Sequence, residues 1–170
     1  MNKYNLRAEY VKKIHPHTYK RIEENVEPNL LNRNFDIEHP NKVWVTDITY
    51  LIFNNKRAYL STILDLFDRK VVAYRISKFN DNQLVIDTLN EAIAKNKDVY
   101  GLIIHSDQSF QYTSFSYKAI CESVGIQISM SRKGTPLDDS PMESYHRILK
   151  KETLYNNYIT NLLRKKYLIY

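Results

Sequence analysis

The segment Val43–Phe53, with the sequence VWVTDITYLIF, constrains the fold of this chain more than any other feature. It is rich in β-branched and aromatic residues and is apolar on both faces, which predicts a central strand in a covered sheet. Asp47 lies in the middle of this strand, where an unpaired buried charge is costly. A carboxylate satisfied by neighbouring donors and a functional carboxylate are equally good interpretations of that residue on its own.

The pattern after this strand predicts an α/β fold. Turn residues at 54–56 and 68–69 separate further strands, and such short links predict an antiparallel meander. The apolar period then changes from 2 to 3.6, which predicts a helix capped near Asn80 or Asp81. The order β-β-β-α-β-α-β-α gives a mixed five-stranded sheet with helices on both faces. The elements expected after the first strand are strands at 57–64, 70–76, 102–104 and 126–130, and helices at 84–93, at 114–124 and from Ser140-Pro141 onward.

Charge and cysteine content narrow the class of protein. The chain has 25 Lys and Arg against 19 Asp and Glu, a net charge of +6 that favours acidic partners, nucleic acid first among them. Residues 132–170 carry eight basic and four acidic side chains, so most of the excess lies there. The sequence has no apolar run of about 18 residues and no apolar secretory segment, so we expect no membrane partner. Cys121 is the single cysteine, which excludes an internal disulfide and a multi-cysteine zinc site and favours the reducing cytoplasm.

The chain divides into three expected parts. Residues 1–40 are polar and interrupted by prolines, as in an N-terminal arm or the remnant of an upstream region. Residues 41–160 form the compact core, and residues 161–170 form a C-terminal tail. Within the arm we expect at most a short helix at 19–24, and we interpret His15 and His17 as solvated because one distant cysteine makes a poor zinc set with them.

Two further carboxylates have positions that suit a shared site with Asp47. Asp107 directly follows a predicted strand, and ligands bind at strand ends in open α/β sheets, although a turn or capping role fits as well. Glu143 fits a capping box with Ser140, yet it also shares one helix face with His146, Arg147 and Lys150. Three such acids brought together would bind Mg²⁺ or Mn²⁺, and two ions would serve phosphodiester chemistry.

Other titratable residues receive structural interpretations. Asp65 and Asp68 are expected to be turn residues, and His105 is expected to orient its loop. Asp138 and Asp139 are expected to cap the last helix.

Four ordered motifs resemble a known family: WVTDITY at 44–50, HSDQ with QYTS at 105–114, SMSRKG at 129–134, and ES with LKKE at 143–152. They are similar to the integrase-type DDE catalytic core of bacterial insertion-sequence transposases. The group in question encodes its transposase in two overlapping frames, and this chain resembles the second-frame product. Thirty-five residues separate Asp107 from Glu143, which matches the D-D-35-E pattern of that group.

The resemblance implies an RNase H-like fold in which residues 41–160 are the catalytic core. Asp47, Asp107 and Glu143 would be the catalytic and metal-binding triad, with two Mg²⁺ or Mn²⁺ ions. The implied reaction is DNA strand nicking followed by 3′-hydroxyl strand transfer in transposition and DNA integration. The implied partners are element ends, target DNA and further copies of the chain, at the bacterial nucleoid. The expected DNA contacts are Arg132, Lys133, Arg147, Lys150 and Lys151.

The sequence also departs from the family pattern. Ser109 stands where the family usually has Gly, and Asp139 stands where Asn is common. The upstream helix-turn-helix regions are absent and residues 161–170 diverge, which favours a truncated copy. The alternative to an active enzyme is therefore a catalytically idle, DNA-binding transposase remnant. A third hypothesis is an RNase H-like nuclease that does not carry out transposition.

Overall fold

The computed structural model describes residues 25–53, 56–96 and 98–155. The expected helix at 19–24, the two histidines His15 and His17, and the tail 161–170 lie outside these residues. In the described part of the chain, every helix falls short of the length and apolarity that a membrane crossing requires.

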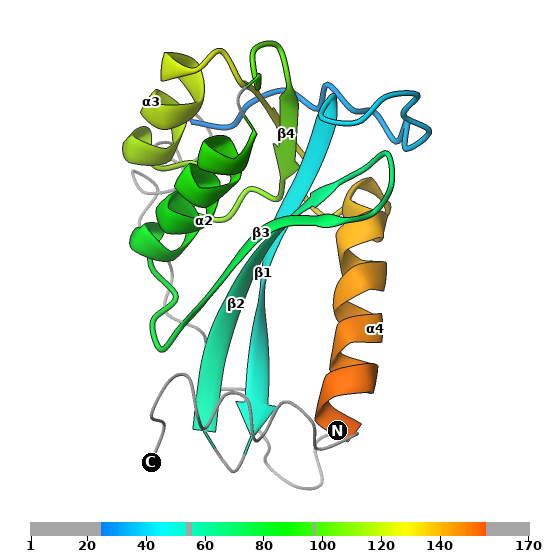
Figure 1. Cartoon of the computed structure of the whole chain (residues 1–170), viewed down its shortest axis with the longest axis vertical. Helices are drawn as coiled ribbons and strands as arrows, with labels where there is room; N and C mark the ends of the chain where they lie inside the picture. Colours follow the sequence, from blue (N-terminus) through cyan, green and yellow to red (C-terminus); the bar gives the residue numbers. More distant parts are fainter. Residues whose placement is uncertain (1–24, 54–55, 97, 156–170) are drawn as a thin grey trace, which may run out of the picture.

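A five-stranded mixed sheet forms the centre of the molecule (Figure 1). Its strand order is β3-β2-β1-β4-β5, so the first strand is central, as predicted. β1, β2 and β3 form the expected antiparallel meander, while β4 pairs parallel to β1 and β5 pairs parallel to β4. The strands are β1 Val43–Phe53, β2 Lys56–Asp65, β3 Val71–Ser77, β4 Ile103–Ser106 and β5 Gln127–Met130.

Helices lie on both faces of this sheet, which confirms the predicted fold class. α2, Asn82–Lys95, and α3, Phe115–Ser123, lie on one side, and α4, Ser140–Tyr155, lies on the other (Figure 1). Asp81 caps α2 by accepting from Leu84 N at 3.1 Å, as expected from the sequence. Trp44 and Leu89 are fully buried in the core between the sheet and α2–α3. Met142 of α4 is fully buried in a second core on the opposite face.

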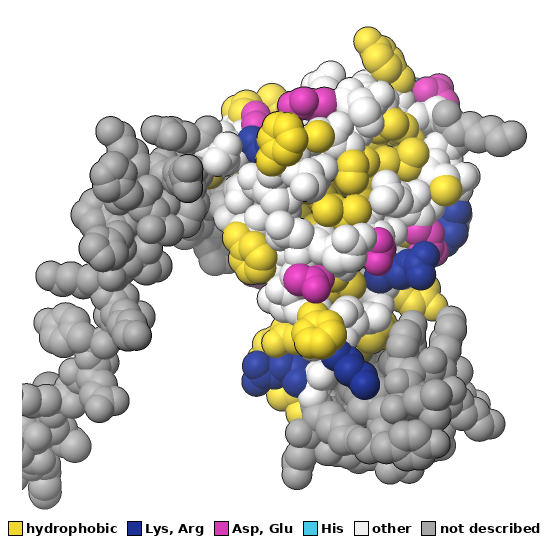
Figure 2. Space-filling model, turned by 90° about the vertical axis from the view of Figure 1, so that its left-hand side faces the viewer, with side chains coloured by type: hydrophobic (Ala, Val, Ile, Leu, Met, Phe, Trp, Pro, Cys, Tyr) yellow, Lys and Arg dark blue, Asp and Glu magenta, His cyan; other side chains and the backbone are white. Residues whose placement is uncertain are grey.

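The covering of β1 is less complete than its composition predicts. Trp44 and Val45 have no exposed surface, whereas Tyr50 is 51% and Ile52 is 50% exposed. In the same part of β1 the strand pairing also thins out, because β4 pairs with β1 only over Val43–Val45 and the rest of that edge has no strand neighbour among the described residues. On the face seen in Figure 2, Lys and Arg side chains flank hydrophobic ones on the narrow lower part of the described structure.

The last helix begins differently from the prediction. A 3₁₀ turn, η1 Pro136–Asp139, leads directly into α4, and Ser140 already has helical angles of φ −54° and ψ −32°. A capping residue is extended rather than helical, so Ser140 does not cap α4 and the capping-box interpretation of Glu143 is wrong. The predicted capping roles of Asp138 and Asp139 are wrong as well, because both lie inside this turn.

The segment 27–33, which we call the N-terminal strap, lies against the core. It runs beside the end of β5, where Leu30 N donates to Ser129 Oγ at 2.9 Å and Met130 N donates to Pro28 O at 3.3 Å. Leu31 is 5% exposed and packs in the α4-side core. Part of the predicted N-terminal arm therefore contributes to the packing of the domain.

Candidate functional site

Asp47 projects from the centre of β1 toward α4. Its Oδ1 accepts a hydrogen bond from Ile48 N at 2.7 Å, and its Oδ2 lies 3.3 Å from His146 Nδ1. Its side chain is 24% exposed, so the carboxylate reaches solvent despite its position in a core strand. His146, three residues after Glu143 on the same helix face, was not predicted as a site residue.

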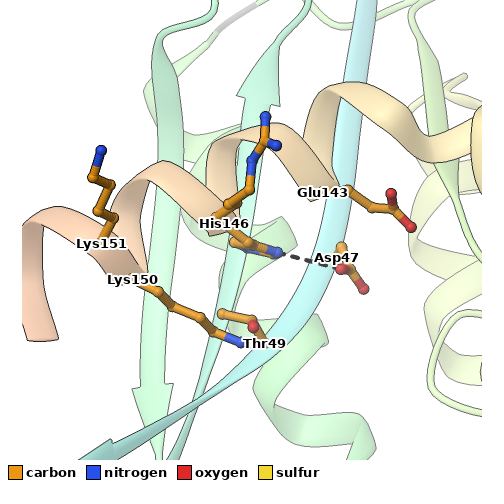
Figure 3. Close-up of a pocket in the computed structure, with 7 residues that line it drawn as sticks. Asp47, Thr49, Glu143, His146, Lys150 and Lys151 are labelled. Carbon is orange, nitrogen blue, oxygen red and sulfur yellow. Dashed lines mark ion pairs between the residues drawn. The ribbon is translucent and has the colours of Figure 1, made fainter.

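α4 places an acidic and a basic group beside Asp47. Asp47 and Glu143 line one open pocket, and Figure 3 shows their carboxylates pointing to the same side of it. The remaining lining residues are Thr49, His146, Arg147, Lys150 and Lys151. Since residues three and four apart share a helix face, the 100° spacing of α4 explains why these side chains converge. The structure thus brings two of the three predicted carboxylates and three of the five predicted DNA contacts together.

Asp107 lies next to Asp47 because of strand register. Val45 of β1 is paired with His105 of β4. Asp47 and Asp107 each come two residues after these paired residues, so the register brings them next to each other. Burial raises the pKa of Asp107, the hydrogen bonds from Ser109 oppose that rise, and the Asp47 charge adds to it. Ser109 donates to Asp107 Oδ1 both from its backbone N–H, at 2.9 Å, and from its hydroxyl. The serine that departs from the family pattern therefore contacts Asp107 directly.

His105 orients its loop, as predicted, rather than facing the pocket. It is fully buried, with Nε2 3.1 Å from Asp138 O and Nδ1 2.8 Å from Ser129 Oγ. A carbonyl oxygen only accepts, so Nε2 carries the proton and Nδ1 accepts from the Ser129 hydroxyl. Burial lowers the pKa of this imidazole, which agrees with a neutral ring.

Asp139, which the sequence analysis assigned to capping, is a fourth acid close enough to Asp47, Asp107 and Glu143 to interact with their charges. It is 9% exposed, and within the described structure its Oδ1 has no hydrogen-bond partner. Burial, together with the charges of Asp47, Asp107 and Glu143, raises its pKa to about 8. The signal in the sequence was its position four residues before Glu143, one helical turn away.

Two of the predicted DNA contacts lie outside this pocket. Arg132 forms an ion pair with Asp138, with Nε 2.8 Å from Oδ2 and Nη2 3.1 Å from Oδ1. Lys133, its neighbour, is exposed in the loop between β5 and η1. Lys150 extends from the pocket to Tyr50, where its Nζ lies 4.4 Å from the ring centroid, and Arg57 lies 5.5 Å from the same ring.

The donor set fits a hard divalent cation in chemistry. Carboxylate oxygens are the ligands that Mg²⁺ and Mn²⁺ prefer. The buried Asp139 Oδ1 has no hydrogen-bond partner in the described structure and interacts with three neighbouring acids, so a cation would supply the charge that it lacks. Within residues 25–53, 56–96 and 98–155, however, no three His, Cys, Asp or Glu side chains are placed to hold an ion at once. Metal binding would therefore need side-chain rotation.

The family model for the integrase core domain matches residues 37–136. The chain belongs to the integrase core domain family. The match includes Asp47 and Asp107 and ends before Glu143 and α4. The strand order and the placement of the helices are those of an RNase H-like fold, as predicted.

The relatives of this integrase core domain confirm the resemblance to insertion-sequence transposases. It is 42% identical over 127 residues to the transposase for insertion sequence element IS904 of Lactococcus lactis, covering 75% of this chain and 50% of the relative. It is 37% identical over 139 residues to the putative transposase InsK for IS150 of Escherichia coli, covering 82% and 49%. The chain thus spans about half the length of the curated relatives it matches.

Solved structures show the same fold. The intasome of simian T-cell lymphotropic virus, in complex with PP2A regulatory subunit B56γ, contains a chain with a TM-score of 0.63 and 25% identity. That match covers 80% of this chain and 45% of the other. The HTLV-2 integrase catalytic core in complex with magnesium, in its trimeric form, matches with a TM-score of 0.56 and 20% identity, covering 75% and 74%.

Proposed function

We propose that this chain is the catalytic core of an insertion-sequence transposase that breaks and joins DNA phosphodiester bonds with divalent metal ions. The observation that carries the proposal is the pocket in which Asp47 and Glu143 lie beside Arg147, Lys150 and Lys151, with Asp107 adjacent through strand register. The carboxylates suit divalent metal ions, and the Arg and Lys side chains suit DNA phosphates. The pocket therefore combines the two kinds of side chain that a metal-dependent reaction on DNA requires.

Each group has a distinct task in this proposal. Asp47, Asp107 and Glu143 would hold two Mg²⁺ or Mn²⁺ ions, which when bound would supply Lewis-acid activation of the attacking oxygen and stabilise charge on the leaving oxygen. The oxygen of water, and later of a 3′-hydroxyl, forms a new bond to phosphorus as the bond to the leaving 3′-oxygen breaks. Lys150 and Lys151 lie seven and eight residues after Glu143, about 10–12 Å along the helix, and would bind phosphates next to the reacting one.

The experiment is metal-dependent nicking of a labelled duplex that carries the terminal inverted repeats flanking the gene. We expect cleavage in Mg²⁺ or Mn²⁺, and a loss of at least about 100-fold in Asp107→Asn and in Glu143→Gln, since even groups around a metal site alter activity 10- to 100-fold. Asp87→Asn is the matched control, because it removes one exposed carboxylate from α2 on the opposite face of the sheet. Cleavage that survives Asp107→Asn would refute the triad.

A catalytically idle, DNA-binding remnant is the second candidate. The observation in its favour is that the described residues place no three metal-binding side chains together. It predicts salt-dependent DNA binding by the native chain, with no nicking in either metal ion. The same nicking assay therefore separates the two functions. Whether the chain acts as a multimer is a separate question, which analytical ultracentrifugation with paired DNA ends tests.

A further inference from the structure

The fourth acid of the site, Asp139, is not explained by the packing around it. Its neighbour Asp138 has a side chain with no exposed surface and accepts from Arg33, Arg132 and Asn29. Asp139 is nearly as buried, yet its Oδ1 accepts from nothing in the described structure. A buried polar atom without a partner is rare in native proteins and calls for a reason.

The surroundings of Asp139 make this arrangement costly for the protein alone. Asp47 comes from β1, Asp107 follows β4, and Glu143 lies one turn further along α4, and the charge of each disfavours an ionised Asp139. Two nearby side chains of α4 contact other groups. His146 contacts Asp47, and Lys150 extends to Tyr50. Burying like charges together without a counter-ion costs free energy, so the fold retains an unfavourable group at this point.

We propose that Asp139 is a fourth carboxylate donor to the divalent-cation site formed by Asp47, Asp107 and Glu143. The inference rests on the proposed function and adds to it a ligand outside the three-acid pattern. Mg²⁺ and Mn²⁺ accept six oxygen ligands, so a fourth carboxylate has a place in the coordination shell. A bound cation supplies the charge and the partner that Asp139 Oδ1 lacks. An Asn at this position would bring an oxygen but no charge.

The test measures Mn²⁺ binding to the full chain without DNA, by isothermal titration calorimetry and by electron paramagnetic resonance of free Mn²⁺. We expect Asp139→Asn to bind Mn²⁺ at least about tenfold more weakly than the native chain. In EDTA, the same variant should unfold at an equal or higher temperature, because the substitution removes a buried carboxyl whose ionisation the three neighbouring acids disfavour. A purely structural Asp139 would give the opposite pattern of lower stability and unchanged affinity. Asp87→Asn, the same substitution at an exposed position of α2, is the control.

A second variant guards against a local packing defect in the first. Asp139→Glu keeps a carboxylate on a longer side chain and should bind Mn²⁺ more tightly than Asp139→Asn. Equal Mn²⁺ affinity and stoichiometry in the native chain and in Asp139→Asn would overturn the inference while leaving the proposed function intact. If instead Asp107→Asn binds Mn²⁺ as well as the native chain, the three-acid site is wrong, and the proposed function fails together with the inference.

Discussion

Two consecutive aspartates show how strongly local contacts decide the state of a carboxylate. Hydrogen bonds from Arg132, and further ones from Arg33, hold the pKa of Asp138 well below its usual range. Burial and the neighbouring acids raise the pKa of Asp139 to about 8. The two residues share a 3₁₀ turn, in which successive side chains point about 120° apart. One side chain therefore faces the strap and the other faces the acids.

Asp138→Asn should lower the stability of the domain and change its response to acid. The pKa of Asp138 lies below the 3.8 of an unconstrained aspartate, so its stabilising effect is present above about pH 4 and is lost as pH falls below that value. We expect the variant to unfold at a lower temperature at pH 7 and to lose less stability between pH 4 and pH 2. Thermal unfolding followed by circular dichroism measures both effects.

The control for this prediction is Asp68→Asn. Asp68 pairs with Lys70 in an exposed turn, where the Lys70 side chain is 80% exposed. Exposed ion pairs contribute little to stability, so this variant should unfold close to the native temperature. If Asp138→Asn also matches the native chain at pH 7, the Arg33 and Arg132 contacts do not stabilise the domain.

Residue roles could be predicted where the partners are close in sequence. Asp65 accepts from Phe67 N and Asp68 accepts from Lys70 N, each two residues later, so both are turn residues as expected. Asp65 also accepts from Asn41 N, a contact 24 residues away that the sequence did not indicate. The roles of Asp138 and Asp139 were missed because their partners are distant in sequence. Arg33 lies 105 residues before Asp138, and no local pattern indicates that pairing.

At the scale of elements, α4 follows its periodicity closely. Met142 and Leu149 pack into apolar clusters, whereas Glu143, Arg147 and Lys150 line the pocket, as the 100° spacing predicts. The strand bounds also agree with prediction to within one or two residues, because β-branched runs and turn residues are local signals. The start of α4 differs because the 3₁₀ turn depends on the tertiary contacts of Asp138.

Lys150→Gln should weaken DNA binding without preference for sequence. If Lys150 binds a phosphate, its loss reduces the slope of log K against log salt concentration by about 1. Fluorescence anisotropy with a labelled duplex, between 50 and 200 mM salt, measures this slope. Lys95→Gln is the matched control, because Lys95 lies at the end of α2, on the other side of the sheet, and pairs with Glu91. An unchanged slope for Lys150→Gln would remove Lys150 from the interface.

At the scale of the whole molecule, hydrogen bonds connect the N-terminal strap to the 3₁₀ turn that leads into α4. The strap contacts Ser129 and Met130 at the end of β5 and reaches Asp138 through Asn29 and Arg33. His105 joins the same network through Ser129 and the Asp138 carbonyl. The turn that positions Glu143 is thus held from both β4 and a segment about 100 residues earlier in the chain.

Removing the strap should therefore destabilise the domain. The test compares two chains, one that begins at residue 25 and one that begins at residue 34. The two chains differ only in residues 25–33. Loss of the Leu31 burial alone costs about 1.5–3 kcal/mol, which corresponds to at least about 3 °C in Tm for a domain of this size. Differential scanning calorimetry measures the difference. Equal Tm values for the two chains would show that the strap contributes nothing to the core.

The overall fold could be predicted almost completely, because the order of elements and their periodicity are sequence-local. The site was predictable in part. The three acids have recognisable positions, but the inclusion of Asp139 and His146 depends on how η1 and α4 pack against β1. Packing of this kind is a property of the assembled sheet rather than of any one segment.

The burial of Cys121 has a practical consequence for mapping DNA on this domain. Its side chain has no exposed surface, and burial raises the pKa of the thiol to about 12, so almost no reactive thiolate forms at neutral pH. It is also the single cysteine of the chain. A cysteine introduced at position 147 or 151, in place of Arg147 or Lys151, would then be the only reactive thiol that can form a disulfide with a thiol-tethered oligonucleotide. Disulfide trapping of a protein–DNA complex can therefore use the native sequence without first replacing Cys121, because Cys121 does not compete for the oligonucleotide.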